Sequence, residues 1–502
     1  MSARGRVLAV DLGTGAVKAG VFEPGLAEPL ALAAAPYRVP TDRVHPERAE
    51  VDAQEWRSAA AIAIASLPDG LRRSVAAVGL TGLFPAVVPL DADGRALAPA
   101  ILYCDRRSVA QVERLRAERT AELIERIGGS VLTCGTTSLT SWLWVRENEP
   151  EIAQRARWYG HASTWLGAWL TGEIAMDRSN AAMSGLLDSG RGEWSSEVAD
   201  AVRVDLACLP RLVSGTEAVG MLLPEPAADL GLPTGTPVAL AGGDTACAAV
   251  GAACLEPGEC FISSGTTDTI CLCLDRYAFD PRLFSTVHAL PRRWLSMAPT
   301  TYTGGSIEWA ARLLHGDPSV QPLLADAAEV AIGAGGLVFI PYLMGERSPV
   351  NDPLARGVLV GMTPETDRRH VARAVVDGTS LAIRSCVDAL AEANGVRPDT
   401  ITIVGRPASS ELLNRSRAAA CGVPVRALAF EEGTLLGSAA CGAVAGGLAK
   451  TTDDVTGPFL ASARIFEPRP SAAEVYDRLY PLFRDTYRCL AGAGLFARLG
   501  QV

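Results

Sequence analysis

The stretch that decides the fold is residues 7–22, with the sequence VLAVDLGTGAVKAGVF. Four apolar residues at 7–10 favour a short buried strand, and residues 11–15 carry the glycines of a tight turn. Residues 16–22 predict a second strand, so the pattern indicates a β-hairpin with a glycine-rich tip. A dinucleotide-binding fingerprint would instead run from a strand into a helix, and Lys18 occupies the position of its third glycine.

A second hairpin of the same kind is predicted about half a chain length later. Residues 260–262 favour a strand, residues 263–267 (SSGTT) form a tip, and residues 269–274 favour the returning strand. Two halves that each carry a strand, a Gly-Thr tip and a strand indicate a duplicated architecture. Gly-Thr turns are common, so coincidence is the alternative.

The remaining patterns predict a mixture of strands and helices, with a division into two lobes near residues 240–255. Strands are expected at 75–80, 87–90, 238–241 and 401–404, and helices at 106–126, 140–146 (stopped near Pro150), 368–393, 435–444 and 472–487. Residues 449–470 are expected to be mostly loop. The strand at 238–241 ends in Gly242-Gly243-Asp244, which is expected to form a tight turn where the lobes meet.

Composition excludes several classes of function. The net charge of -10 and the absence of a basic stripe argue against a nucleic-acid partner. The 12 cysteines form no CxxC pair and the 5 histidines are scattered, so no zinc site is expected and the cysteines fit a reducing compartment. No signal peptide or membrane span is expected, which predicts a cytoplasmic location without a membrane partner.

Familiar nucleotide-binding and hydrolase motifs are missing, but the two hairpin tips offer another way to hold phosphate. The sequence has no Gly-Lys of a P-loop and no Gly-x-Ser-x-Gly elbow. Glycine-rich tips expose successive backbone N–H groups that bind anions. Thr14, Thr266 and Thr267 add hydroxyls and Lys18 adds charge. Asp11, where the first strand ends, is expected either to hold Mg²⁺ through its water shell or only to cap the turn.

Asp244 is the second carboxylate at a strand end. Transfer of a phosphoryl group to an alcohol needs a base for the hydroxyl proton, and an Asp where two lobes meet suits that role. The alternative is an ordinary solvated turn residue.

Taken together, these motifs resemble the FGGY family of carbohydrate kinases, in particular its xylulokinase-like branch. The motifs are Asp11-x-Gly13-Thr14, Gly242-Gly243-Asp244, Ser264-Gly265-Thr266-Thr267 and Tyr302-Thr303-Gly304-Gly305, in that order. The most specific stretch is residues 341–349 (PYLMGERSP), followed by Asp352-Pro353 and Ala355-Arg356-Gly357. The resemblance runs from about residue 7 to about residue 487.

The resemblance implies an α/β fold of the two-lobed, actin-like (ribonuclease H-like) ATPase type, with duplicated domains at residues 1–243 and 244–502 around a central cleft. It also implies ATP and Mg²⁺ as cofactors and a sugar or polyol as substrate. Proteins of this kind are often dimers, which leaves a homodimer open. By analogy Asp244 matches the catalytic base and Asp11 the magnesium turn, while the nucleotide-binding positions are Gly13, Thr14, Lys18, Gly265, Thr266, Gly304, Gly305, Gly405 and Ala408.

The expected sugar pocket departs from the family pattern. Leu83-Phe84-Pro85 replaces Gln-Met-His, Tyr103-Cys104-Asp105 replaces Trp-Asn-Asp, and Thr245 stands where Asn is common. The predicted substrate-binding residues are therefore Leu83, Phe84, Tyr103, Asp105, Asp244 and Thr245. Because lost polar groups change how a pocket recognises hydroxyls, plain D-xylulose is not the expected substrate. A deoxy-sugar, modified sugar, shorter polyol or cyclitol fits better.

The adenosine loop departs as well, since Gly405-Arg406-Pro407-Ala408 replaces Gly-Gly-Gly-Ala. This change either weakens nucleotide affinity or lets Arg406 contact the nucleotide. The leading prediction is an active carbohydrate kinase. The alternatives are a nucleotide-binding regulator with the same fold and another actin-like phosphotransferase or ATPase acting on a non-sugar.

Overall fold

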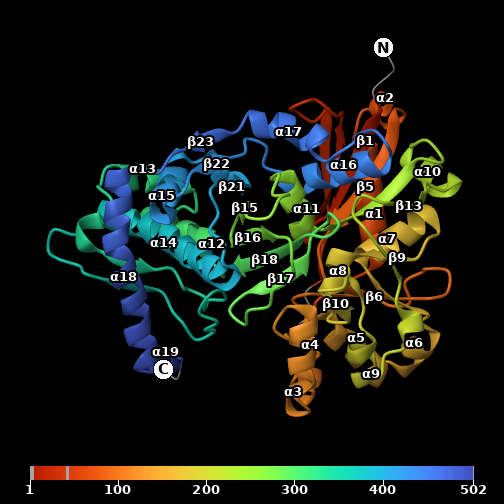
Figure 1. The fold of residues 1–502 in the computed structure, drawn as a ribbon, viewed down its shortest axis with the longest axis horizontal. Coiled ribbons are helices and arrows are strands. Elements are labelled where there is room, and N and C mark those ends of the chain that lie inside the picture. Colours follow the sequence, from red (N-terminus) through yellow and green to blue (C-terminus); the bar gives the residue numbers. More distant parts are fainter. Residues whose placement is uncertain (1–4, 41–43, 501–502) are drawn as a thin grey trace.

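The computed structural model describes residues 5–40 and 44–500 and contains two large sheets, one at each side of the molecule (Figure 1). The first has the order β13 (Ala218–Met221), β14 (Pro237–Gly243), β5 (Val75–Gly82), β1 (Arg6–Leu12), β2 (Ala16–Phe22) and β3 (Ala31–Pro36). The second has the order β17 (Phe284–Val287), β18 (Trp294–Pro299), β16 (Asp268–Leu274), β15 (Cys260–Ser264), β21 (Ile401–Val404), β22 (Val425–Ala427) and β23 (Arg464–Phe466).

The two sheets repeat one local topology. In the first, β1 pairs antiparallel with β2 and parallel with β5. In the second, β15 pairs antiparallel with β16 and parallel with β21. Both predicted hairpins are thus present, each beside a parallel strand, which confirms the predicted duplicated α/β architecture.

Smaller sheets complete the strand inventory. They pair β4 (Glu50–Val51), β7 (Ala100–Leu102), β6 (Ala86–Leu90) and β8 (Trp158–His161); β9 (Ala175–Asp177) and β12 (Arg211–Val213); β10 (Leu187–Asp188) and β11 (Glu193–Trp194); and β19 (Val338–Ile340) and β20 (Val358–Val360).

Helices cover both large sheets and fill the connections. In the first half they are α1 (Ala53–Ala65), α2 (Asp69–Arg72), α3 (Val109–Ala117), α4 (Thr120–Gly128), α5 (Ser138–Asn148), α6 (Pro150–Arg155), α7 (Ala162–Thr171), α8 (Arg178–Ala182), α9 (Ser196–Ala201), α10 (Pro224–Leu230) and α11 (Asp244–Gly251). The later ones are α12 (Thr303–His315), α13 (Val320–Ala328), α14 (Arg368–Asn394), α15 (Glu411–Cys421), α16 (Gly433–Ala445), α17 (Asp453–Ala461), α18 (Pro470–Gly492) and α19 (Leu495–Leu499).

Helix α16, from the second half of the chain, packs on the first sheet and on α11 (Figure 1). A Cβ on Gly79 of β5 would lie 2.1 Å from the backbone oxygen of Ser438, and one on Gly437 would lie 1.8 Å from that of Cys247. Only glycine permits such close backbone contact. The apolar face of α16 therefore completes the core on one side of β1 and β5.

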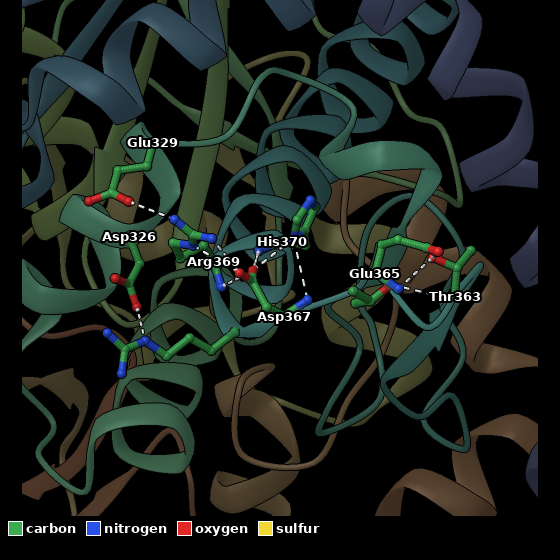
Figure 2. Close-up of polar contacts among 9 residues, drawn as sticks. Asp326, Glu329, Thr363, Glu365, Asp367, Arg369 and His370 are labelled. Carbon is green, nitrogen blue, oxygen red and sulfur yellow. Dashed lines mark hydrogen bonds and ion pairs between the residues drawn. The ribbon is translucent and has the colours of Figure 1, made fainter.

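Helix α14 agrees with its prediction over 368–393 and begins with a strong cap. The Asp367 side chain accepts hydrogen bonds from the backbone N–H groups of Arg369 and His370. In return, the ring nitrogen Nδ1 of His370 accepts a hydrogen bond from the backbone N–H of Asp367. Arg369 also pairs with Glu329 of the α13 C-terminal region at 3.1 Å (Figure 2). These contacts fix the start of the helix that supports the second sheet.

Three predicted segments differ from the structure. The helix expected at 106–126 is two helices, α3 and α4, because Arg119 has a φ of 62° that interrupts helical hydrogen bonding. Pro150 begins α6 instead of only ending α5, since proline suits the first helical turn. The loop expected at 449–470 contains α17 and β23; Val455 and Phe459, four residues apart, bury one face of α17.

Within the described residues, no helix combines the length and apolarity needed to cross a membrane.

Candidate active site

The first hairpin tip joins β1 to β2 and lies at the end of the first sheet. Strand pairing places Asp11 opposite Lys18. The Gly13 N–H donates to the backbone oxygen of Ala16 at 3.0 Å, and the Tyr37 hydroxyl donates to that of Gly13, which holds the turn. The N–H groups of Thr14 and Gly15, both exposed, find no acceptor within the described residues. They are available to an anion.

The second tip joins β15 to β16, and the start of α12 packs directly on it. A Cβ on Gly304 would lie 1.8 Å from the backbone oxygen of Gly265, and the Gly305 N–H donates to that of Thr266 at 2.9 Å. The N–H groups of Thr266 and Thr267 find no acceptor in the part of the chain that the structure describes. The structure thus brings together four of the predicted nucleotide-binding positions.

The predicted adenosine loop follows β21 and lies beside the second tip. Gly405 has a φ of 99°, and a Cβ there would lie 2.2 Å from the backbone oxygen of Ser264. Ala408 is buried, and its carbonyl accepts a hydrogen bond of 2.7 Å from the Asn414 side chain. Residues 406–409 form a short 3₁₀ helix with the proline at its start, where a missing N–H costs nothing.

Two carboxylates lie where strands of the first sheet end. Asp11 is at the end of β1, and Asp244 is the first residue of α11, directly after β14. The sequence predicted a tight turn at Asp244; instead Gly243 caps a helix, which points the positive end of the helix toward the carboxylate.

The two carboxyl groups are close enough to influence each other. Burial, and next the negative charge of Asp244, raise the pKa of Asp11 to about 7. Burial raises the pKa of Asp244 to about 6, although hydrogen bonds from the backbone and hydroxyl of Thr245 oppose the shift. A carboxylate that is removed from water and lies near a like charge favours proton uptake or a bound cation.

Lys18 has a partner that sequence reasoning missed. Its ammonium nitrogen lies 2.6 Å from a carboxylate oxygen of Glu432, the cap of α16, and both side chains are about one-third exposed (38% and 34%). Lys18 lowers the pKa of Asp11 and Glu432 raises it. One of the three N–H donors of the Lys18 ammonium is thus engaged by Glu432.

Three of the predicted substrate-binding residues surround Asp244. The Phe84 ring lies against Gly243, because a Cβ there would be 2.6 Å from it, and the Phe84–Pro85 peptide is cis. Tyr103 is 40% exposed; burial raises its pKa, Asp244 adds to the rise and Arg347 opposes it. The Thr245 hydroxyl donates to the Asp244 carboxylate. The two aromatic rings, Phe84 and Tyr103, make the rest of this side of the site largely apolar.

Two other predicted substrate-binding residues have structural roles. The Leu83 side chain is buried in the core of the first half, because its N–H continues the pairing with Leu12. The Asp105 carboxylate accepts hydrogen bonds from the Ala49 N–H at 2.7 Å and from the Arg107 guanidinium at 2.7 and 2.9 Å. With these donors engaged, Asp105 holds the loop, and its contact with a substrate stays a prediction.

Arg347 and Glu346 are further functional candidates. They belong to the specific run at residues 341–349 but were not among the predicted site residues. Arg347 extends from the second half, donates to the backbone oxygen of Thr300 at 2.5 Å and influences Tyr103 of the first half. Glu346 accepts from the Thr301 and Arg347 N–H groups, and burial raises its pKa to about 7. The long specific run at 341–349 was the signal that could have identified them.

Comparisons with known proteins agree with this geometry. The model of the N-terminal domain of the FGGY family of carbohydrate kinases matches residues 6–251, and that of its C-terminal domain matches residues 260–446. The predicted domain boundary at 243/244 stays a prediction.

The chain is 33% identical to the xylulose kinase of Escherichia coli K12, over 80% of this chain and 82% of that protein. It is 29% identical to the glycerol kinase of Dechloromonas aromatica, over 88% of each chain. The crystal structure of xylulose kinase from Rhodospirillum rubrum superimposes with a TM-score of 0.88 at 29% identity, covering 98% of this chain and all of the other. With both domains present and the actin-like fold shared, the chain belongs to the FGGY family of carbohydrate kinases.

Proposed function

We propose that this carbohydrate kinase transfers the terminal phosphoryl group of ATP to a hydroxyl of a sugar, ketose or polyol, with Asp244 as the general base. The observation that carries the proposal is a pair of carboxylates at strand ends, Asp11 and Asp244, the second of which affects the ionisation of the first, together with two glycine-rich tips. Four backbone N–H groups of these tips lack an acceptor among the described residues. This combination suits a polyphosphate and an alcohol that react side by side.

Asp244 would take the proton from the attacking hydroxyl. With a pKa of about 6 it is ionised near pH 7, yet it is a stronger base than an ordinary aspartate. Thr245 holds one of its oxygens, which leaves the other free to accept the proton of the substrate hydroxyl. The Phe84 ring beside it limits access of water to the carboxylate.

Asp11 would hold Mg²⁺, directly or through water. Its carboxylate is buried but accepts no hydrogen bond from the described residues, and oxygen ligands are those that Mg²⁺ prefers. Mg²⁺ supplies positive charge that offsets the charge of the phosphates. The N–H groups of Thr14, Gly15, Thr266 and Thr267 would hold the phosphate oxygens, with Gly405 and Ala408 beside the adenosine.

The acceptor is proposed to be less polar than D-xylulose. Phe84, Pro85 and Tyr103 line the approach to Asp244, and an aromatic or apolar wall leaves substrate hydroxyls unpaired. Xylulose kinases and a glycerol kinase are among the relatives, which supports a small acceptor with a primary hydroxyl. A deoxy-sugar or a short polyol meets these conditions, whereas a cyclitol, with only secondary hydroxyls, does not.

The test is acceptor-dependent ADP release with Mg²⁺ and ATP, measured for D-xylulose, 1-deoxy-D-xylulose, glycerol, erythritol and myo-inositol. We expect 1-deoxy-D-xylulose, glycerol or erythritol to give a higher kcat/KM than D-xylulose, and Asp244→Asn to lose the acceptor-dependent rate while keeping its fold. A best rate with D-xylulose would refute the substrate proposal. Nucleotide binding without transfer to a broad acceptor panel would favour the regulator instead.

A further inference from the structure

A cavity of about 370 Å³ lies between the two halves of the chain, and none of the predicted site residues lines it. The first half contributes residues 177–179, 189–192 and 213–215, and the second half contributes residues 287–294. The latter residues are the end of β17, the β17–β18 turn and the start of β18. This volume is in the range of pockets for small metabolites.

The cavity wall carries an excess of positive charge. Four arginines line it: Arg178 and Arg191 from the first half, and Arg292 and Arg293 from the second. Its one acidic lining residue, Asp177, is already saturated, because the Ser179 hydroxyl and the Asn180 backbone and side chain donate to its carboxylate.

Two of the four guanidinium groups have no acidic partner. Arg293 lies 2.7 Å from a carboxylate oxygen of Glu256, and Arg191 lies 3.7 Å from one of Asp188. Within the described ranges 5–40 and 44–500, Arg178 and Arg292 have no carboxylate within 4.0 Å. Arg178 uses only its Nε, which donates to the backbone oxygen of Gly192 at 3.0 Å. Its terminal nitrogens, and the whole Arg292 guanidinium, are available to an anion.

Arg292 stands at a backbone position that favours glycine. Its φ is 56°, in the turn closed by the hydrogen bond from the His288 N–H to the Arg293 backbone oxygen at 3.0 Å. A non-glycine residue is strained in that conformation, and such strained residues are frequent at ligand-binding and switch sites. The turn thus places Arg292 in the cavity wall, where its positive charge is available to an anionic ligand.

The cavity lies next to the strand end that carries Asp244, the proposed base. The Ser179 hydroxyl oxygen accepts a hydrogen bond of 2.8 Å from the N–H of Gly243, the residue that caps α11 in front of Asp244. A Cβ on Gly242 would lie 3.2 Å from that same oxygen and 3.5 Å from the Cβ of Ala289. Lining residues from both halves therefore pack against the strand end that positions Asp244.

We propose that this cavity is a regulatory site for a small phosphate monoester, such as a sugar phosphate, which joins the two halves by binding Arg178 and Arg292 together. Guanidinium groups bind phosphate oxygens in a two-pronged geometry, and apolar side chains such as Leu290 and Trp294 offer surface for the carbon skeleton. An occupant that touches both halves and Ser179 changes how the halves sit around Asp244. The proposal adds a site to the kinase and does not depend on which alcohol it phosphorylates.

Calorimetric titration of the full chain with inorganic phosphate and with ribose 5-phosphate tests the site. We expect Arg178→Gln and Arg292→Gln each to weaken ribose 5-phosphate binding about 10- to 100-fold. Arg312→Gln, which removes an exposed arginine of α12 that has no ion pair among the described residues, should bind like the unchanged protein. Equal binding by all four proteins, or no binding at all, would overturn the site. Equal affinity for the two probes would overturn the assignment to an ester in favour of the inorganic ion.

Crystals soaked in tungstate separate this cavity from the phosphate tips. Anomalous density between Arg178 and Arg292, lost in Arg292→Gln, supports the proposal. Density only at residues 13–15 and 264–267 would show that the anion binds the nucleotide site and would contradict it. The kinetic counterpart is a change of at least about twofold in KM or kcat on addition of ribose 5-phosphate, which Arg292→Gln should abolish.

Discussion

Replacing Asp244 with asparagine should inactivate the kinase and at the same time stabilise its fold. The carboxyl has a pKa of about 6 in the folded protein against an ordinary value of 3.8. Folding therefore takes up a proton between these two pH values, and ionisation of Asp244 above them lowers the stability of the wild type. Asparagine keeps the shape, and its oxygen still accepts from Thr245 without a buried charge.

The magnitude follows from that shift. About two pKa units at ~1.36 kcal/mol each give roughly 3 kcal/mol at pH 8. This is an upper figure, because the side chain keeps some contact with solvent. Near pH 5 roughly half of the difference should remain, since both states are then partly protonated. In a lobe of this size, that gain in the free energy of unfolding corresponds to a Tm of Asp244→Asn about 5–10 °C above the wild type at pH 8, and about half that difference at pH 5.

Thermal unfolding followed by circular dichroism at pH 5 and pH 8 measures the effect, with ADP release measured in parallel. Asp399→Asn is the matched control, because Asp399 is exposed and has no ion pair among the described residues. Its Tm should match that of the wild type at both pH values. A Tm for Asp244→Asn that equals or falls below that of the wild type at pH 8 would refute the reasoning about the buried charge.

Two further predictions concern the same site. The kcat of the wild type should fall about tenfold per pH unit below about pH 6, because protonation of Asp244 removes the base; a pH–rate profile that stays flat to pH 5 would contradict this role. Gly304→Ala should raise the KM for ATP about tenfold or more, because its Cβ would lie 1.8 Å from the Gly265 backbone oxygen and displace the second tip. Gly457→Ala, with nothing within 4 Å of the added Cβ, is the control. An equal KM for ATP in the two variants would argue against ATP binding by the second tip.

Much of the fold could be predicted because its signals are local. The two hairpins, around Gly13 and Gly265, carry strand and turn patterns that need no distant information. The helix at 368–393 carries a long apolar period and ends at Gly395. The break at Arg119 could not be predicted in this way, because no glycine or proline marks that left-handed residue.

The site was harder to predict because its parts come from distant segments. The residues that resemble the family motifs predicted the two hairpin tips and both carboxylates at strand ends, while their roles toward phosphate and substrate stay predictions. The Lys18–Glu432 pair joins residues 414 positions apart, and neither belongs to a pattern that names the other. Leu83 and Asp105 were assigned by analogy, and their substrate contacts stay predictions; that Leu83 packs in the core and that Asp105 pairs with Arg107 could not be predicted, because only packing reveals it.

The way α16 crosses between the halves has a consequence for biosynthesis. Residues 433–445 of α16 and, after them, Val455 and Phe459 of α17 form the late-translated part of the core around Val7 and Ala9. On the ribosome, the first six-stranded sheet therefore waits for most of the chain before one of its faces is covered. A fragment that ends before Gly433 would expose that face to other chains, so the two lobes mature together and not one after the other.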